Sequence, residues 1–171
     1  DTASTATLTA ILTAREKATG FAINREGASQ SPVFRVYCST ETHSSVEKGA
    51  KIAGVGSQHV VKIGTDEALA MRPDLLEAAI QQDLAEGKKP LCVVAALGTT
   101  GTTAIDPLAE IAQICQKYGV WLHVDAAYAG PLLLLPEYRY MAEGMELADS
   151  FVFNPHKWMM VHFDCTAYFV K

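Results

Sequence analysis

The chain has 171 residues, of which 49% are hydrophobic, so it can bury one substantial core and form one domain. Its formal charge of -5 and the lack of any run of Lys or Arg argue against nucleic acid or an anionic membrane surface as the main partner, and favour a small-molecule ligand. No stretch approaches the roughly 20 apolar residues of a membrane span, so no membrane partner is expected.

The first part of the chain alternates between segments that favour helix and segments that favour strand. Residues 8–15 favour a helix, with Ser4 and Thr5 as capping candidates, and a loop follows from Gly20 to Gly27. Strand, helix and strand are then expected in turn, over residues 33–38, 44–53 and 59–63.

An amphipathic helix is predicted over residues 74–86, because three apolar side chains stand four apart on one face: Leu76, Ile80 and Leu84. Gly87 follows, where a left-handed helix cap is expected. Residues 91–97 are a continuous apolar run without polar alternation. This pattern is typical of a strand that is covered on both faces of a sheet.

A second amphipathic helix is expected to begin at Asp106 and Pro107, as N-cap and first turn, and to end at Gly119. Residues 121–125 and 150–153 supply two more strands. We therefore predict an α/β fold, a three-layer sandwich around a mostly parallel sheet. Ligands of such folds bind beyond the carboxyl ends of the strands, so functional side chains are expected there.

The cysteines show no C-x-x-C spacing and stand mostly inside apolar runs, at Cys38, Cys92, Cys115 and Cys165. They indicate buried free thiols of a reducing compartment. The histidines lack the spacing of a zinc site, so no metal is expected. No secretory leader opens the chain, which makes the cytoplasm the expected location. The absence of a starting methionine and the stop in mid-strand suggest a fragment of a longer polypeptide.

Two charged side chains stand beside the ends of predicted strands. Lys157 is an isolated cation among apolar neighbours. Burial would lower the pKa of its amine, and a neutral amine can form a Schiff base with a carbonyl. A surface lysine that extends to water is the alternative. Asp125 ends the strand 121–125, where its carboxylate could pair with a protonated pyridine nitrogen or cap the next turn.

Weaker signals point to the same kind of ligand. Ser4 and the N–H groups beside it could hold a phosphate at the positive helix end, or Ser4 could be a plain cap. Residues 97–101 suit a turn or a cofactor contact. His43 could stack on a flat ring, or be an exposed capping residue. His123 shares a strand face with Asp125, which fits a supporting role or a hydrogen-bonded core histidine.

Two motifs carry a family resemblance: HVDAAYAG at residues 123–130 and NPHKW at residues 154–158. They resemble the group II pyridoxal-phosphate (PLP)-dependent decarboxylases, which include aromatic-L-amino-acid, tyrosine, tryptophan and histidine decarboxylases. The resemblance runs along essentially the whole chain, including residues 2–4, 42–45 and 97–100. It implies PLP as cofactor and the large domain of fold type I, the aspartate-aminotransferase-like fold, truncated at both ends.

By this resemblance, residues 1–171 are a partial PLP-binding domain. The N-terminal segment, a mobile loop with a catalytic tyrosine and a small C-terminal domain would be missing. Relatives of this family are homodimers with active sites at the subunit interface. A homodimer is therefore expected of the full-length protein, and little or no turnover of this chain alone.

The resemblance also assigns residues. Lys157 would form the Schiff base with the cofactor, and Asp125 would pair with its pyridine nitrogen. His43 would stack on the ring from the substrate side, and Ala127 would pack against the other face. Further cofactor contacts would come from Ala3, Ser4, Asn154 and His156. Thr100 would either contact the cofactor or support His43.

The implied activity is that of a carboxy-lyase, which converts an aromatic L-amino acid such as DOPA, tyrosine or tryptophan into its amine and carbon dioxide. Histidine is an alternative substrate, because residues 158–166 are similar to histidine decarboxylases. An aromatic aldehyde synthase is another alternative, which His43 disfavours because some insect synthases carry Asn there. A non-catalytic nucleotide-binding module is remote, since residues 54–56 lack the third glycine of G-x-G-x-x-G. A structural or interaction remnant stays open.

Overall fold

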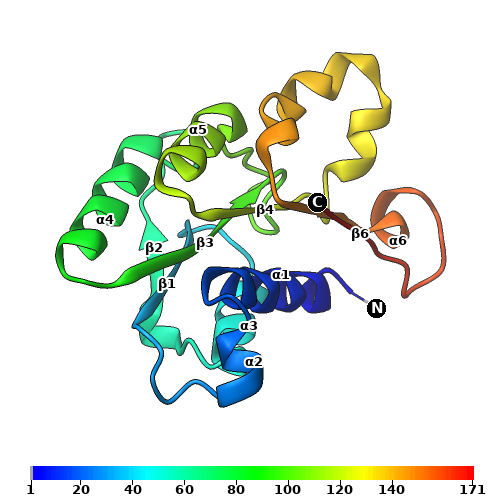
Figure 1. Cartoon of the computed structure of the whole chain (residues 1–171). Helices are drawn as coiled ribbons and strands as arrows, with labels where there is room; N and C mark the ends of the chain where they lie inside the picture. Colours follow the sequence, from blue (N-terminus) through cyan, green and yellow to red (C-terminus); the bar gives the residue numbers. More distant parts are fainter. Residues whose placement is uncertain (1) are drawn as a thin grey trace.

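A computed structural model describes residues 2–171 as a six-stranded sheet with helices on both faces (Figure 1). The strand order is β2-β1-β3-β4-β5-β6; the first five strands are parallel, and β6 runs antiparallel to β5. The predicted α/β sandwich with a mostly parallel sheet is confirmed. The strands are β1 (Phe34–Ser39), β2 (Val60–Ile63), β3 (Lys89–Ala96), β4 (Trp121–Asp125), β5 (Ser150–Phe153) and β6 (Ala167–Val170).

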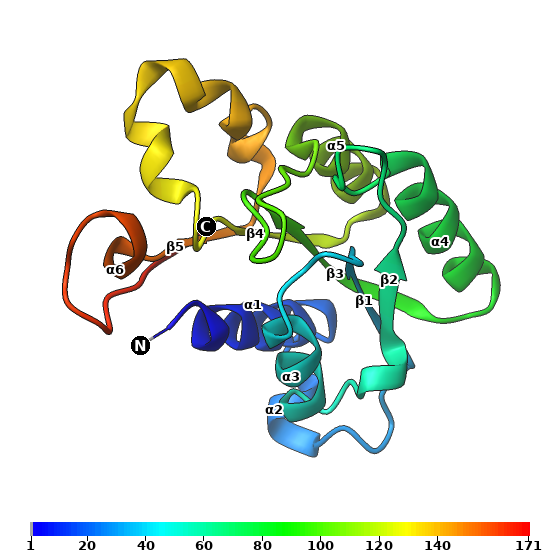
Figure 2. The ribbon, with the colours of Figure 1, turned by 180° about the vertical axis from the view of Figure 1, so that it is seen from behind.

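The helices form the two outer layers. The sheet separates α1, α2 and α3 from α4 and α5, as the two opposite views show (Figures 1 and 2). The α-helices are α1 (Ala3–Ala18), α2 (Ala22–Glu26), α3 (Ser45–Ile52), α4 (Pro73–Ala85), α5 (Leu108–Tyr118) and α6 (Pro155–Trp158). Short 3₁₀ helices are η1 (Ser57–His59), η2 (Gly130–Leu134), η3 (Pro136–Ala142) and η4 (Met145–Leu147).

Each face of the sheet has its own hydrophobic core. Successive side chains of a strand point to opposite faces, so Val93 packs with the α4 and α5 side chains while Val94 packs with those of α1 and α3. Residues of β3 from Leu91 to Ala96 are buried. The unbroken apolar run of this strand therefore reflects burial on both faces.

Helix α1 is longer than predicted and begins differently. Thr2 is its N-cap, and the Thr2 and Thr5 side chains form a reciprocal capping box in which the Thr2 N–H donates to Thr5 Oγ1 over 3.1 Å. Thr5 thus has a capping role, whereas Ser4 lies inside the first helical turn and the expectation that it caps is wrong. Helix α2 lies where only a loop was expected.

Two further expectations are corrected. Asp106 is not the N-cap of α5; its buried carboxylate accepts N–H groups from Met71 (2.8 Å) and Ala96 (2.7 Å), and so joins two loops. Leu84 was expected on the apolar face of α4, but its side chain is 47% exposed, because the adjacent Asp83 is the buried residue at that end of the helix. The left-handed glycines after α4 and α5, Gly87 and Gly119, are confirmed.

All four cysteines are free thiols; three are buried, and Cys165 is half-buried. Among residues 2–171, no helix combines the length and the apolar character needed to cross a membrane.

Candidate active site

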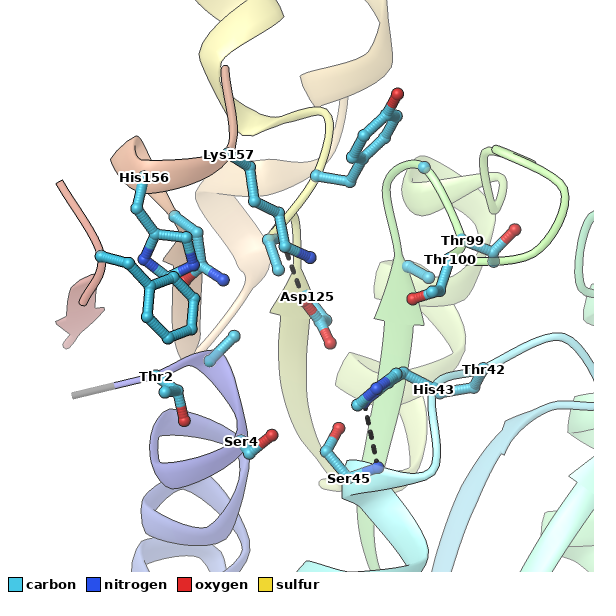
Figure 3. Close-up of a pocket in the computed structure, with 17 residues that line it drawn as sticks. Thr2, Ser4, Thr42, His43, Ser45, Thr99, Thr100, Asp125, His156 and Lys157 are labelled. Carbon is cyan, nitrogen blue, oxygen red and sulfur yellow. Dashed lines mark hydrogen bonds between the residues drawn. The ribbon is translucent and has the colours of Figure 1, made fainter. Parts of the chain in front are cut away.

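A cavity of about 240 Å³ opens at the carboxyl edge of the sheet, between the start of α1 and the segments that follow β1, β3, β4 and β5 (Figure 3). Parallel strands end at a common edge, so side chains far apart in the sequence meet there. Every site residue expected from the sequence lines this cavity: Ala3, Ser4, His43, Thr100, Asp125, Ala127, Asn154, His156 and Lys157.

Asp125 is the acidic group of the cavity. It is the last residue of β4, and its Oδ1 accepts the backbone N–H of Ala127 over 3.0 Å, which fixes the carboxylate direction. Burial raises the pKa of Asp125, and the Ala127 N–H and the nearby Lys157 and His43 only partly offset this effect. A cationic ligand group beside Asp125 would therefore be stabilised by pairing with it.

Lys157 reaches into the same cavity from α6, and Figure 3 shows its amine on the side of Asp125. The sequence left open whether this lysine is buried or lies at the surface; its side chain is exposed, because α6 lies at the cavity rim. The next residue, Trp158, packs edge-on against Tyr128 with ring centroids 4.7 Å apart. This contact holds α6 against the turn that follows β4.

Asn154 and His156 organise the return of the chain after α6. The buried Asn154 accepts a hydrogen bond at Oδ1 from the Thr166 hydroxyl over 2.8 Å. His156 Nδ1 accepts the backbone N–H of Cys165 over 2.9 Å, and its ring centroid lies 4.5 Å from that of Phe163. Both residues thus shape the wall of the cavity in addition to lining it.

The opposite wall carries the imidazole of His43. Its Nδ1 accepts the backbone N–H of Ser45 over 3.2 Å, which orients the ring at the start of α3 (Figure 3). The loop that follows β3 also lines the cavity, and Thr100 of this loop is exposed there. Gly98 in this loop has a positive φ of 81°, and a Cβ there would lie 2.9 Å from Ala129 Cβ. Close approach of the loop to the β4 turn therefore requires glycine.

The start of α1 completes the cavity. Ala3 and Ser4 are the first two residues of α1, and their N–H groups have no partners within the helix. The positive end of a helix of this length favours an anion. The lining residues that were not singled out from the sequence include Tyr128, which lies within the 123–130 motif, and Phe163, which follows α6 without any periodic pattern.

Comparison with known proteins identifies the family. The model of the pyridoxal-dependent decarboxylase conserved domain matches residues 1–171. The chain belongs to the pyridoxal-dependent decarboxylase family. It is 46% identical to aromatic-L-amino-acid decarboxylase of Bos taurus over 99% of its length, and 44% identical to histidine decarboxylase of Rattus norvegicus over 99%. These proteins are amino-acid decarboxylases by name.

The same decarboxylase fold is found in solved structures. The crystal structure of Oryza sativa TDC with PLP superposes with a TM-score of 0.93 at 34% identity, covering 99% of this chain and 36% of the other. The chain thus has the architecture of fold type I PLP-dependent decarboxylases. It spans 35% of the bovine aromatic-L-amino-acid decarboxylase and 26% of the rat histidine decarboxylase.

Proposed function

We propose that the protein containing this chain decarboxylates an aromatic L-amino acid such as DOPA, tyrosine or tryptophan, releasing the amine and carbon dioxide. The observation that carries the proposal is the shared cavity of Lys157 and Asp125, an amine and a half-buried carboxylate, in a chain of a pyridoxal-dependent family. We propose residues 1–171 as part of a larger PLP-binding domain.

The residues of the cavity fit PLP group by group. Lys157 offers an amine for the aldehyde, and the α1 N–H groups at Ala3 and Ser4 suit the phosphate. Asp125 suits the protonated pyridine nitrogen, since its partly desolvated carboxylate is stabilised by a cation. His43 and Ala127 would lie on opposite faces of the flat ring. Thr100, Asn154 and His156 complete the proposed contacts.

Bound there, PLP supplies an electron sink for the bond that breaks at the α-carbon of the amino acid. The chain contributes positioning and charge. Asp125 would hold a proton on the pyridine nitrogen, and Ala127, being small, would leave room for the ring. His43 would cover the ring face on the substrate side. Lys157 would hold the cofactor through its amine.

We infer that the working protein is a homodimer. Apolar side chains are strongly exposed around the rim of the cavity, where Phe163 is 77% and Met160 100% exposed. Large exposed apolar patches are typical of protein interfaces. Leu134 and Tyr140, each 66% exposed, are two further exposed apolar side chains. The free thiols support a reducing, cytoplasmic location.

Histidine is the second candidate substrate, since the histidine decarboxylase of rat is almost as similar to the chain as the bovine aromatic enzyme. An aldehyde synthase is the third, and the presence of His43 disfavours it. The products distinguish the three: aromatic amine, histamine, or an aldehyde together with ammonia.

The test uses the full-length protein with PLP, beside Lys157→Ala and the control Lys48→Ala. Lys48 is an exposed lysine of α3 that does not line the cavity. We expect borohydride to attach PLP covalently to the parent and to Lys48→Ala but not to Lys157→Ala, as measured by mass spectrometry. We expect carbon dioxide from DOPA, tyrosine or tryptophan with the same two proteins. Trapping at an unchanged level in Lys157→Ala would overturn the assignment.

A further inference from the structure

His123 is a buried residue of β4 that the proposed chemistry does not use. It lies two positions before Asp125, so both side chains project from the same face of the sheet. Its side chain is fully buried, and its neighbour across the sheet is Ser150 of β5. Burial lowers the pKa of His123 to about 3, so its ring is neutral at physiological pH.

Two hydrogen-bonding side chains, Trp121 and His123, meet at the hydroxyl of Ser150. Trp121 Nε1 lies 2.9 Å from Ser150 Oγ, and His123 Nδ1 lies 2.9 Å from the same atom. An indole N–H can only donate, so Ser150 accepts from Trp121. Ser150 keeps its own hydroxyl proton, and we assign that proton to the hydrogen bond with His123 Nδ1. With this assignment His123 bears its own proton on Nε2.

His123 Nε2 is buried and has no hydrogen-bond partner among residues 2–171. The Tyr168 hydroxyl is in the same situation: it lies near Ser150 without a hydrogen bond of normal geometry, and its ring centroid is 6.1 Å from that of His123. Buried polar groups in proteins are nearly always paired, often through an internal water. Two unpaired polar groups on neighbouring buried rings are a setting in which proteins hold an internal water.

We propose that His123 is a positioning residue for Asp125, whose carboxylate receives the Nε2–H hydrogen bond through one internal water and is thereby held ionised and directed into the cavity. Asp125 Oδ1 already accepts the Ala127 N–H, so the added bond gives the carboxylate a second donor. The charged groups that face Asp125 are Lys157 and His43. The importance of an ionised Asp125 for PLP rests on the proposed function; the hydrogen-bond chain does not.

Two substitutions separate this role from simple packing. In His123→Gln the amide nitrogen reaches the position of Nε2 and can still donate. In His123→Asn the amide reaches only the position of Nδ1, so the donor toward Asp125 is lost. Both variants keep a polar amide at a buried site. Ser150→Ala is the third variant, which leaves His123 in place but removes the proton that fixes its tautomer.

Three measurements on the full-length protein test the proposal. Long-range ¹H–¹⁵N spectra of the PLP-free protein report the tautomer, and carboxyl ¹³C shifts report the pKa of Asp125. We expect the Nε2–H tautomer in the parent and mixed tautomers in Ser150→Ala. We expect a higher pKa of Asp125 in His123→Asn than in His123→Gln. Equilibrium dialysis should show PLP affinity about tenfold to hundredfold lower for Asn, and nearly unchanged for Gln, because a hydrogen bond to a charged group is lost only in Asn.

An Nδ1–H tautomer in the parent would overturn the proposal. So would variants that melt at lower temperature while sharing the Asp125 pKa of the parent, since His123 would then be a core residue only. If the parent itself fails to bind PLP, the proposed function fails, and the tautomer and the Asp125 pKa still decide the role of His123.

Discussion

Gly130→Ala tests how tightly the turn after β4 packs against β5. Gly130 is the first residue of η2, and its N–H donates to the Ala126 carbonyl over 2.8 Å. A Cβ at this position would lie 2.4 Å from Cβ and 3.2 Å from Cγ of Phe153. Carbon atoms in contact are about 3.5–4.0 Å apart, so one of the two segments must move by more than about 1 Å.

The displaced atom is close to the backbone, so a rotamer change cannot relieve the contact. Overpacking of this kind costs about 1–3 kcal/mol, and we expect the upper end of that range. Phe153 immediately precedes Asn154 and α6, so the movement would also shift Lys157 relative to Asp125. Loss of stability and weaker PLP binding should therefore appear together.

The assay is urea unfolding of the full-length protein followed by circular dichroism, with PLP affinity from equilibrium dialysis. Gly101→Ala is the control, because no atom lies within 4 Å of a Cβ built there. We expect the control to be neutral or slightly stabilised, since alanine restricts the unfolded chain. Equal urea midpoints and equal PLP affinities for the two variants would refute the close packing of the β4 turn on β5.

Three further predictions concern single side chains. Thr100→Val should lower the affinity for PLP about threefold to tenfold, because one exposed hydroxyl at the cavity is lost, and should leave the urea midpoint unchanged. Equilibrium dialysis measures the affinity, and an unchanged value would show that Thr100 does not contact the cofactor. Asp83→Ala should lower the free energy of unfolding in urea by about 3–5 kcal/mol, because two groups that donate to Asp83 Oδ2 lose their partner: Arg35 Nε (3.0 Å) and the buried Tyr37 hydroxyl (2.8 Å). A decrease as small as that of a surface substitution would contradict this prediction. Burial raises the pKa of Asp106 to about 6, so the folded protein keeps this proton at a pH where the unfolded chain has lost it. The free energy of unfolding should therefore fall by about 3 kcal/mol as the pH rises from about 4 to about 6. Unfolding measurements at pH 4 and 7 should show this decrease in the parent and not in Asp106→Asn.

The sequence predicted best the segments whose burial is visible in their own composition. The strands β4 and β5 have the predicted bounds, because apolar side chains fill them and polar residues end them. Asp106 was misjudged because its partner Met71 is 35 positions away, while the adjacent helix offered a nearer explanation. Contacts of that kind follow from the packing of loops, and no local pattern contains them.

The site was predictable to a similar extent. Asp125, Asn154 and Lys157 stand at the ends of parallel strands, and such ends converge in space. Phe163 reaches the cavity only because the chain returns past α6, a path that no periodicity indicates. The protonation of His123 depends on Ser150, 27 positions later, so it could be inferred only from the folded structure.

The cavity draws its walls from segments that extend from Thr2 to Phe163. No part of it exists in the unfolded chain, so a ligand that binds there binds only the folded protein. At a concentration of 100 times its dissociation constant, such a ligand adds about 2.7 kcal/mol to the free energy of unfolding. Since unfolded chains in cells are continuously degraded, the amount of the protein would rise and fall with the supply of the vitamin from which the cofactor is made.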